Sequence, residues 1–95
     1  MDNRLALMSV AVVMLPEFSA LEQALGAAGR AHHDYETVVL NGVRDELWPG
    51  FYAAFVLGRL GPFATASRLS RLLAEVTAPA DWPAAAARHV LDRLV

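Results

Sequence analysis

The chain has 95 residues, a net charge of −2 and no cysteine, and 56% of its residues are apolar. Its length allows a single small domain, residues 1–95, and its composition excludes an intrinsically disordered chain. Eight cations, all arginine, stand against ten carboxylates, which argues against nucleic-acid binding, and the lack of cysteine excludes disulfides and thiolate chemistry.

The apolar fraction is itself informative. An ordinary soluble domain is about 45–50% apolar, and a chain of this size buries only about 60% of the surface that its unfolded state exposes. We therefore expect apolar side chains at the surface, where they would contact a second copy of the chain or a partner protein.

Leu5–Leu15 is an uncharged run of eleven residues that ends before Pro16. It is too short to cross a bilayer, which takes about 20 residues, so we expect no membrane association. A secretory signal has an apolar region of this length, but residues 1–4 contain one arginine and no convincing Ala-x-Ala sequence follows. We expect a buried helix and a cytoplasmic protein, with a β-strand as the alternative because valine is frequent in residues 10–13.

Apolar or bulky residues then recur at alternating spacings of three and four. The seven positions are Phe18, Leu21, Leu25, Ala28, His32, Tyr35 and Val39. This heptad pattern predicts one long helix over residues 17–41. In an alternative interpretation the helix breaks near Gly29 and residues 35–41 form a strand, because Tyr-Glu-Thr-Val-Val is typical of strands.

Both ends of this long helix have local signals. Ser19 and Glu22 match a capping box near the start. Asn41-Gly42 supplies a left-handed stop, after which Val43 is placed to pack against Val38. These signals support the helical interpretation over the strand.

The heptad seam predicts self-association. A homodimer, with an antiparallel pairing slightly favoured, would bury the apolar side of the long helix and keep the acidic amino-terminal halves apart. The expected contact residues are Phe18, Leu21, Leu25 and Ala28. Gly26 and Gly29 would permit the close approach of a second helix. In the alternative interpretation, other helices of the same chain fill the seam.

Three shorter helices are predicted after the long one. Trp48-Pro49 and Trp82-Pro83 are start signals for helices over Gly50–Leu60 and Ala84–Leu94, because proline fits the first helical turn. The first of these, together with Trp48, is expected to be the most buried helix. Between them, Thr65 or Ser67 caps a helix with an apolar stripe formed by Leu69, Leu72, Leu73 and Val76. The fold class expected is all-α, with about five helices.

The two Trp-Pro segments resemble each other at an offset of 34 residues. Laying Trp48–Leu60 over Trp82–Leu94 matches seven of thirteen residues. An internal duplication would explain the matches. Two helices with similar start signals are the explanation that we favour.

Residues 32–36, His-His-Asp-Tyr-Glu, are the one dense cluster of chemically active side chains. On a helix, His32 and Glu36 lie one turn apart on one side, as do His33 and Glu36, a spacing that suits a divalent metal or a proton relay. Further ligands would come from Asp45, from His89 or from a second subunit, since a metal needs three or four. Alternatively, His33 and Glu36 face solvent and His32 packs in the seam.

Two functions follow from these patterns. The first is a non-catalytic interaction or accessory protein that acts through an apolar self-association or partner-binding surface. The second is a small metal-dependent or acid–base site on the long helix, built from His32, His33 and Glu36. No phosphate-binding glycine loop or nucleophile elbow is present, and neither a cofactor nor an enzymatic activity is identified by any motif. An aromatic group over residues 48–55, which Trp82 could join, lines either a small apolar pocket or the core.

Overall fold

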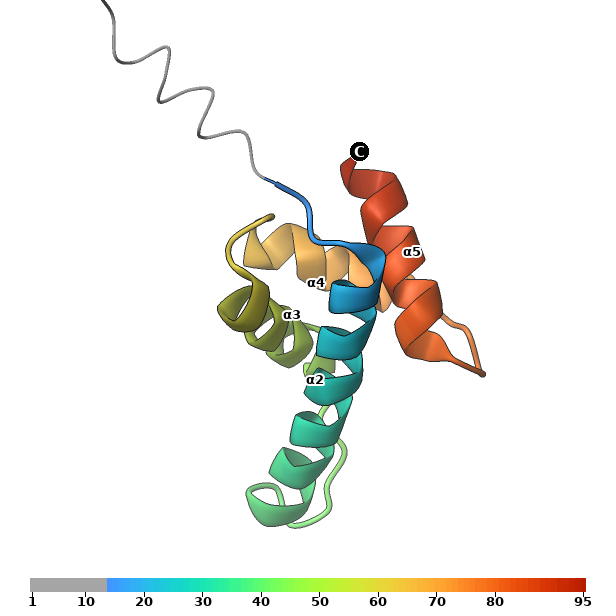
Figure 1. Ribbon diagram of the computed structural model, residues 1–95. Coiled ribbons are helices and arrows are strands. Elements are labelled where there is room, and N and C mark those ends of the chain that lie inside the picture. Colours follow the sequence, from blue (N-terminus) through green and yellow to red (C-terminus); the bar gives the residue numbers. More distant parts are fainter. Residues whose placement is uncertain (1–13) are drawn as a thin grey trace, which may run out of the picture.

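The computed structural model describes residues 14–95, and this part of the chain folds into four helices without a strand (Figure 1). The helices are α2 (Phe18–Val38), α3 (Trp48–Leu60), α4 (Ala66–Ala74) and α5 (Trp82–Leu94). The predicted all-α class is confirmed for this range, with four helices instead of about five. The helix predicted over Leu5–Leu15 lies almost entirely outside the described residues.

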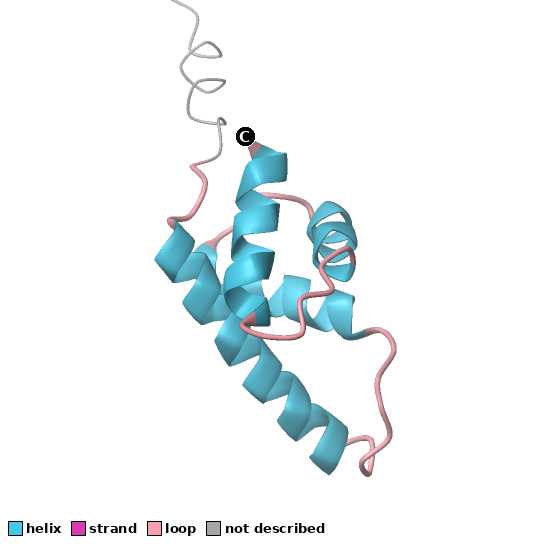
Figure 2. Cartoon of the chain, turned by 90° about the vertical axis from the view of Figure 1, so that its right-hand side faces the viewer, coloured by secondary structure: helices cyan, strands magenta, loops and turns pink. Residues whose placement is uncertain are grey.

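The four helices close into a ring around one core. Helix α2 packs against α3 and α5, and α4 packs against the same two helices from the other side. The carboxyl-terminal half of α2 extends past its neighbours, and the α2–α3 connection turns back beside it (Figure 2). Within residues 14–95 no helix is both long enough and apolar enough to cross a bilayer.

Helix α2 begins close to the predicted residue but without the predicted cap. Glu17 is the N-cap and makes no side-chain capping bond, and the N–H of Leu21 already donates to the Glu17 carbonyl at 3.0 Å. Ser19 therefore lies inside the first turn, where it cannot act as an N-cap. The capping box of Ser19 and Glu22 was a wrong prediction because the helix starts one residue before Ser19.

The end of α2 follows the predicted stop, three residues earlier than the predicted boundary at 41. Asn41 and Gly42 have positive φ angles of 55° and 84°, and the Gly42 N–H donates to the Glu36 carbonyl at 2.8 Å. The predicted packing of Val43 on Val38 gives little burial, since these side chains are 65% and 76% exposed.

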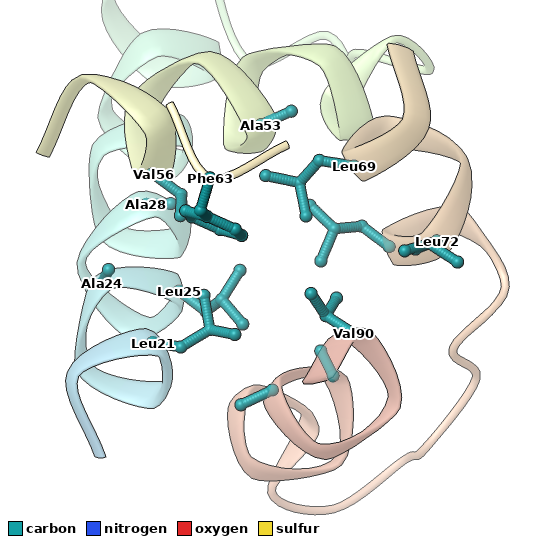
Figure 3. Close-up of a cluster of buried hydrophobic side chains, with 13 residues drawn as sticks. Leu21, Ala24, Leu25, Ala28, Ala53, Val56, Phe63, Leu69, Leu72 and Val90 are labelled. Atoms are coloured by element: carbon teal, nitrogen blue, oxygen red, sulfur yellow. The ribbon is translucent and has the colours of Figure 1, made fainter. Parts of the chain in front are cut away.

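Side chains from all four helices fill the core (Figure 3). On α2 the buried positions are Leu21, Ala24, Leu25, Ala28 and His32. Four of these belong to the heptad seam, so the chain's own helices cover the surface that was expected to form a dimer. Phe63, from the α3–α4 connection, is 5% exposed and joins the same cluster.

The shorter helices start as their signals predict. Both α3 and α5 begin at the tryptophan of the Trp-Pro pair, two residues before the predicted start. Thr65 caps α4, its hydroxyl accepting from the Arg68 N–H at 3.1 Å. The expectation that α3 is the most buried helix is wrong: only Ala53 and Val56 are fully buried there. Its aromatic side chains are only partly buried, although Trp48, Tyr52 and Phe55 pack against the core cluster.

The matched residues of α3 and α5 occupy equivalent environments. Ala53 and Val56 are buried like Ala87 and Val90, and Arg59 and Arg93 are both exposed. Because each helix packs one face into the same core from opposite sides, similar burial demands explain the sequence matches without a duplication.

Candidate functional site

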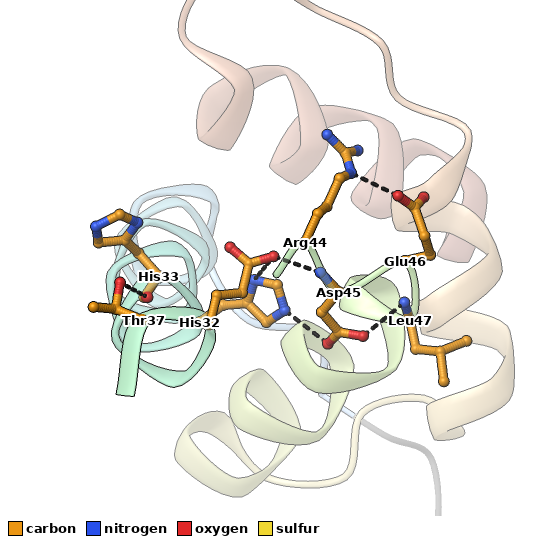
Figure 4. Close-up of polar contacts among 8 residues, drawn as sticks. His32, His33, Thr37, Arg44, Asp45, Glu46 and Leu47 are labelled. Atoms are coloured by element: carbon orange, nitrogen blue, oxygen red, sulfur yellow. Dashed lines mark hydrogen bonds and ion pairs between the residues drawn. The ribbon is translucent and has the colours of Figure 1, made fainter. Parts of the chain in front are cut away.

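The site is built around His32, a buried polar residue on α2. The side chain of His32 is 7% exposed, and its Nε2 lies 2.9 Å from Oδ2 of Asp45 in the α2–α3 connection (Figure 4). An ionised carboxylate only accepts hydrogen bonds, so Nε2 carries the proton and donates. This bond satisfies the polar group that the heptad pattern places at the core boundary.

Asp45 is held in place from both sides. Its Oδ1 accepts from the Leu47 N–H at 3.0 Å, and its own N–H donates to Oε2 of Glu36 at 2.7 Å. The same Glu36 oxygen lies 3.9 Å from Nδ1 of His32, too far for a hydrogen bond. The connection is thus tied to α2 through His32 and Glu36, one turn apart on the same side of the helix.

This environment shifts the acidity of two side chains. The hydrogen bond from His32, followed by the one from the Leu47 N–H, lowers the pKa of Asp45, because both stabilise the carboxylate. Burial raises the pKa of Tyr52, and the negative charge of Glu36 adds to the effect. The site therefore favours an ionised Asp45 beside a neutral phenol.

A pocket of about 320 Å³ opens beside the His32–Asp45 pair. Seven residues line it: His32, Glu36, Arg44, Asp45, Trp48, Tyr52 and Trp82. The three aromatic rings contact one another at steep angles, with centroids 5.0–5.6 Å apart. Trp82 is further oriented by its indole N–H, which donates to the Val76 carbonyl at 3.0 Å.

The structure brings together some of the predicted site residues and separates others. His32, Glu36 and Asp45 meet, whereas His33 is exposed and lies with Thr37 on the side of α2 that faces away from Asp45 (Figure 4). His89 bonds instead to Glu75 at 2.8 Å, between α5 and the end of α4. Among residues 14–95 no group of three His, Cys, Asp or Glu side chains is placed to hold a metal. Metal binding by His32, His33 and Glu36 stays a prediction.

The sequence left open whether Trp48 and Trp82 line a pocket or belong to the core. Both tryptophans of the chain line the pocket, and their rings meet edge to face at 5.6 Å. The signal that could have located them is the repeated Trp-Pro start, because it places a tryptophan at the first residue of each helix.

The chemistry available to this site is binding and proton exchange. A histidine oriented by a carboxylate is one element of an acid–base site, and the aromatic wall offers apolar contact and π-faces. Comparison of the chain with protein-family models, with curated proteins and with solved structures found no match.

Proposed function

We propose that the protein is a non-catalytic interaction module that forms a homodimer in the cytoplasm. The observation that carries this proposal is a set of large apolar side chains exposed where α2 ends and the chain turns toward α3. We name these four residues of the α2 end and the α2–α3 connection the apolar tip: Val38, Val39, Val43 and Leu47, which are 57–80% exposed. The cytoplasmic location is supported only by the sequence of Leu5–Leu15 and the residues around it, which do not fit a secretory signal.

The apolar tip replaces the surface that the heptad pattern indicated. Leu21, Leu25 and Ala28 are at most 1% exposed within the single chain, so they are not free to contact a partner. The tip, in contrast, holds four apolar side chains within ten residues, 38–47. Covering them in a dimer removes apolar surface from water, which is the driving force of most protein association.

Charge distribution favours a second copy as the occupant. Residues 1–58 carry three arginines and seven carboxylates, a net −4, whereas residues 59–95 carry five arginines and three carboxylates, a net +2. The apolar tip belongs to the acidic half, and between Val43 and Leu47 the chain carries Arg44, Asp45 and Glu46, a net charge of −1. In a two-fold dimer the tip of each copy can meet the arginine-bearing half of the other, so that both contacts form at once.

Size-exclusion chromatography with light scattering tests the proposal. At micromolar concentration we expect twice the 10.3 kDa mass of the single chain, and a shift toward that single mass in the double variant Val38→Ser, Val43→Ser. Met14→Ser is the matched control, since Met14 is 88% exposed and lies outside both the apolar tip and the arginine-bearing half. A wild-type particle of 10.3 kDa would refute the homodimer.

A second candidate is an acid–base or metal-dependent site on α2. One observation favours it: the buried His32, hydrogen-bonded to Asp45, forms part of the pocket wall. Such a site would use Glu36 as the carboxylate beside His32. His33 faces away from both, so it could bind a metal only together with ligands from a second subunit. Metal analysis of the purified protein separates this candidate from the interaction module.

A further inference from the structure

We propose that the pocket beside His32 binds a small organic cation with an alkylated ammonium group. None of the four residues of the apolar tip lines the pocket, so ligand binding and dimer formation can be measured separately. Three properties of the pocket carry the inference: its aromatic wall, its excess of carboxylates and its size.

The aromatic wall is formed by rings that stand nearly perpendicular to one another. Trp48 and Tyr52 meet at 73°, Trp48 and Trp82 at 79°, and Tyr52 and Trp82 at 85°. The negative face of an aromatic ring attracts a cation, most strongly in tryptophan, and several rings of different orientation are the usual means of recognising an alkylated ammonium ion. Such an ion is only weakly hydrated, so it loses little on entering an apolar wall.

The charges facing the pocket select the same kind of ligand. Glu36 and Asp45 are carboxylates, and the single arginine, Arg44, has its charge compensated by Glu46 at 2.9 Å. The two carboxylates of the lining outnumber its one arginine, so the pocket has an excess of negative charge. This excess favours a cationic ligand over an anionic one.

One carboxylate oxygen is available to the ligand. Glu36 uses Oε2 toward the Asp45 N–H, and within residues 14–95 no donor is bonded to Oε1. Asp45, in contrast, uses both oxygens, one toward His32 and one toward Leu47. Glu36 is therefore the residue expected to pair with the cation while the aromatic rings contact its alkyl groups.

The volume limits the ligand to a small molecule or a single side chain. About 320 Å³ is at the lower end of the range of ligand pockets, about 300–1,000 Å³. Both a free molecule such as choline and a trimethylated lysine side chain have a head group of the required chemistry. The two ligands share the trimethylammonium group, and they differ in whether that group belongs to a free small molecule or to a protein side chain.

Intrinsic fluorescence reports directly on this pocket, because Trp48 and Trp82 are the two tryptophans of the chain and both line it. The probes are choline, acetylated trimethyl-lysine amide, and 3,3-dimethylbutan-1-ol, which has the shape of choline without the charge. We expect a saturable fluorescence change with the cations and affinity about tenfold or more weaker for the neutral alcohol. Tighter binding of choline assigns a free metabolite as the source, and tighter binding of the lysine derivative assigns a protein side chain.

Two variants and one control complete the test. Glu36→Gln keeps an acceptor for the Asp45 N–H but removes the charge, so it should weaken choline binding several-fold and leave binding of the neutral alcohol unchanged. Trp82→Leu should reduce the preference for the cation, because one of the three aromatic rings is lost while Glu36 remains. Glu75→Gln removes a carboxylate from the other histidine pair, outside the pocket, and should bind like the wild type. No saturable change with either cation, or equal affinity for choline and the alcohol, overturns the proposal.

Discussion

Gly29 of α2 approaches Tyr52 of α3 so closely that a Cβ atom on Gly29 would lie 3.2 Å from the phenol oxygen. The glycine thus allows the aromatic wall of the pocket to rest against α2. Gly26, one turn earlier, has no such neighbour, since a Cβ there would meet only the end of the Arg30 side chain at 3.7 Å. Both glycines were expected to permit the close approach of a second helix, and only Gly29 does so.

The two glycines therefore respond differently to alanine. Gly26→Ala should stabilise the fold by about 1 kcal/mol, because alanine favours the helix by that amount. Gly29→Ala should gain clearly less, or lose stability, since Tyr52 must move. Thermal unfolding of both variants measures the difference. An equal gain at the two positions would contradict the close contact.

His32 and Asp45 should act as a coupled pair. His32→Leu removes the hydrogen bond to Asp45, and Asp45→Asn weakens it, because the amide offers one acceptor oxygen to the two donors that the carboxylate serves. The double variant should therefore be destabilised by less than the sum of the single variants. The readout is the urea-unfolding free energy in a double-mutant cycle. As a control, His89→Leu, which breaks the partly exposed pair with Glu75, should combine additively with Asp45→Asn. Additive effects of His32 and Asp45 would show that the pair contributes nothing as a unit.

Acid should remove the contribution of Asp45. Its folded-state pKa lies below the ordinary value of 3.8, so the folded state keeps the carboxylate ionised where the unfolded state takes up a proton. The stabilisation is complete above 3.8 and is lost as the pH falls through the folded pKa. Urea unfolding from neutral to acidic pH should show a smaller decline in Asp45→Asn than in the wild type. Parallel curves below 3.8 would rule this out.

Alkali should affect Tyr52 in the opposite direction. Its pKa is raised above the ordinary value of 10.0, so the unfolded state loses the phenolic proton first. The contribution of the neutral phenol is complete below 10.0 and declines as the pH rises through the folded pKa. Tyr52→Phe should lack this decline, whereas Tyr35→Phe, which retains Tyr52, should keep it. An ultraviolet titration of the phenols supplies a direct check.

Chelation tests the metal candidate. Because His33 faces away from His32, we expect a chelator to leave the thermal unfolding of the wild type unchanged, and to leave His32→Leu and Glu36→Gln equally insensitive. Loss of stability on chelation in the wild type, with no response in those two variants, would instead establish a metal site on α2.

Local signals were enough to place most of the helices. The Trp-Pro starts, the Thr65 cap and the Asn41-Gly42 stop each depend on backbone groups within a few residues, so they can be identified from the sequence alone. The heptad spacing likewise identified Leu21, Leu25 and Ala28 as buried. The capping box at Ser19 failed because α2 begins at Phe18 with Glu17 as an N-cap that makes no side-chain bond, so the helix starts without the local signal that the pattern requires.

What the sequence by itself determined is therefore the all-α class of residues 14–95 and the apolar face of α2, since both depend on spacing along one helix. Only the tertiary structure decided what covers that face, because a seam of this period accepts another helix of the same chain as readily as a second copy. It also decided that His32 pairs with Asp45, thirteen residues away, while His89 pairs with Glu75. Those partners are brought together by the crossing of the helices and the path of the connections, which no spacing within a single helix encodes.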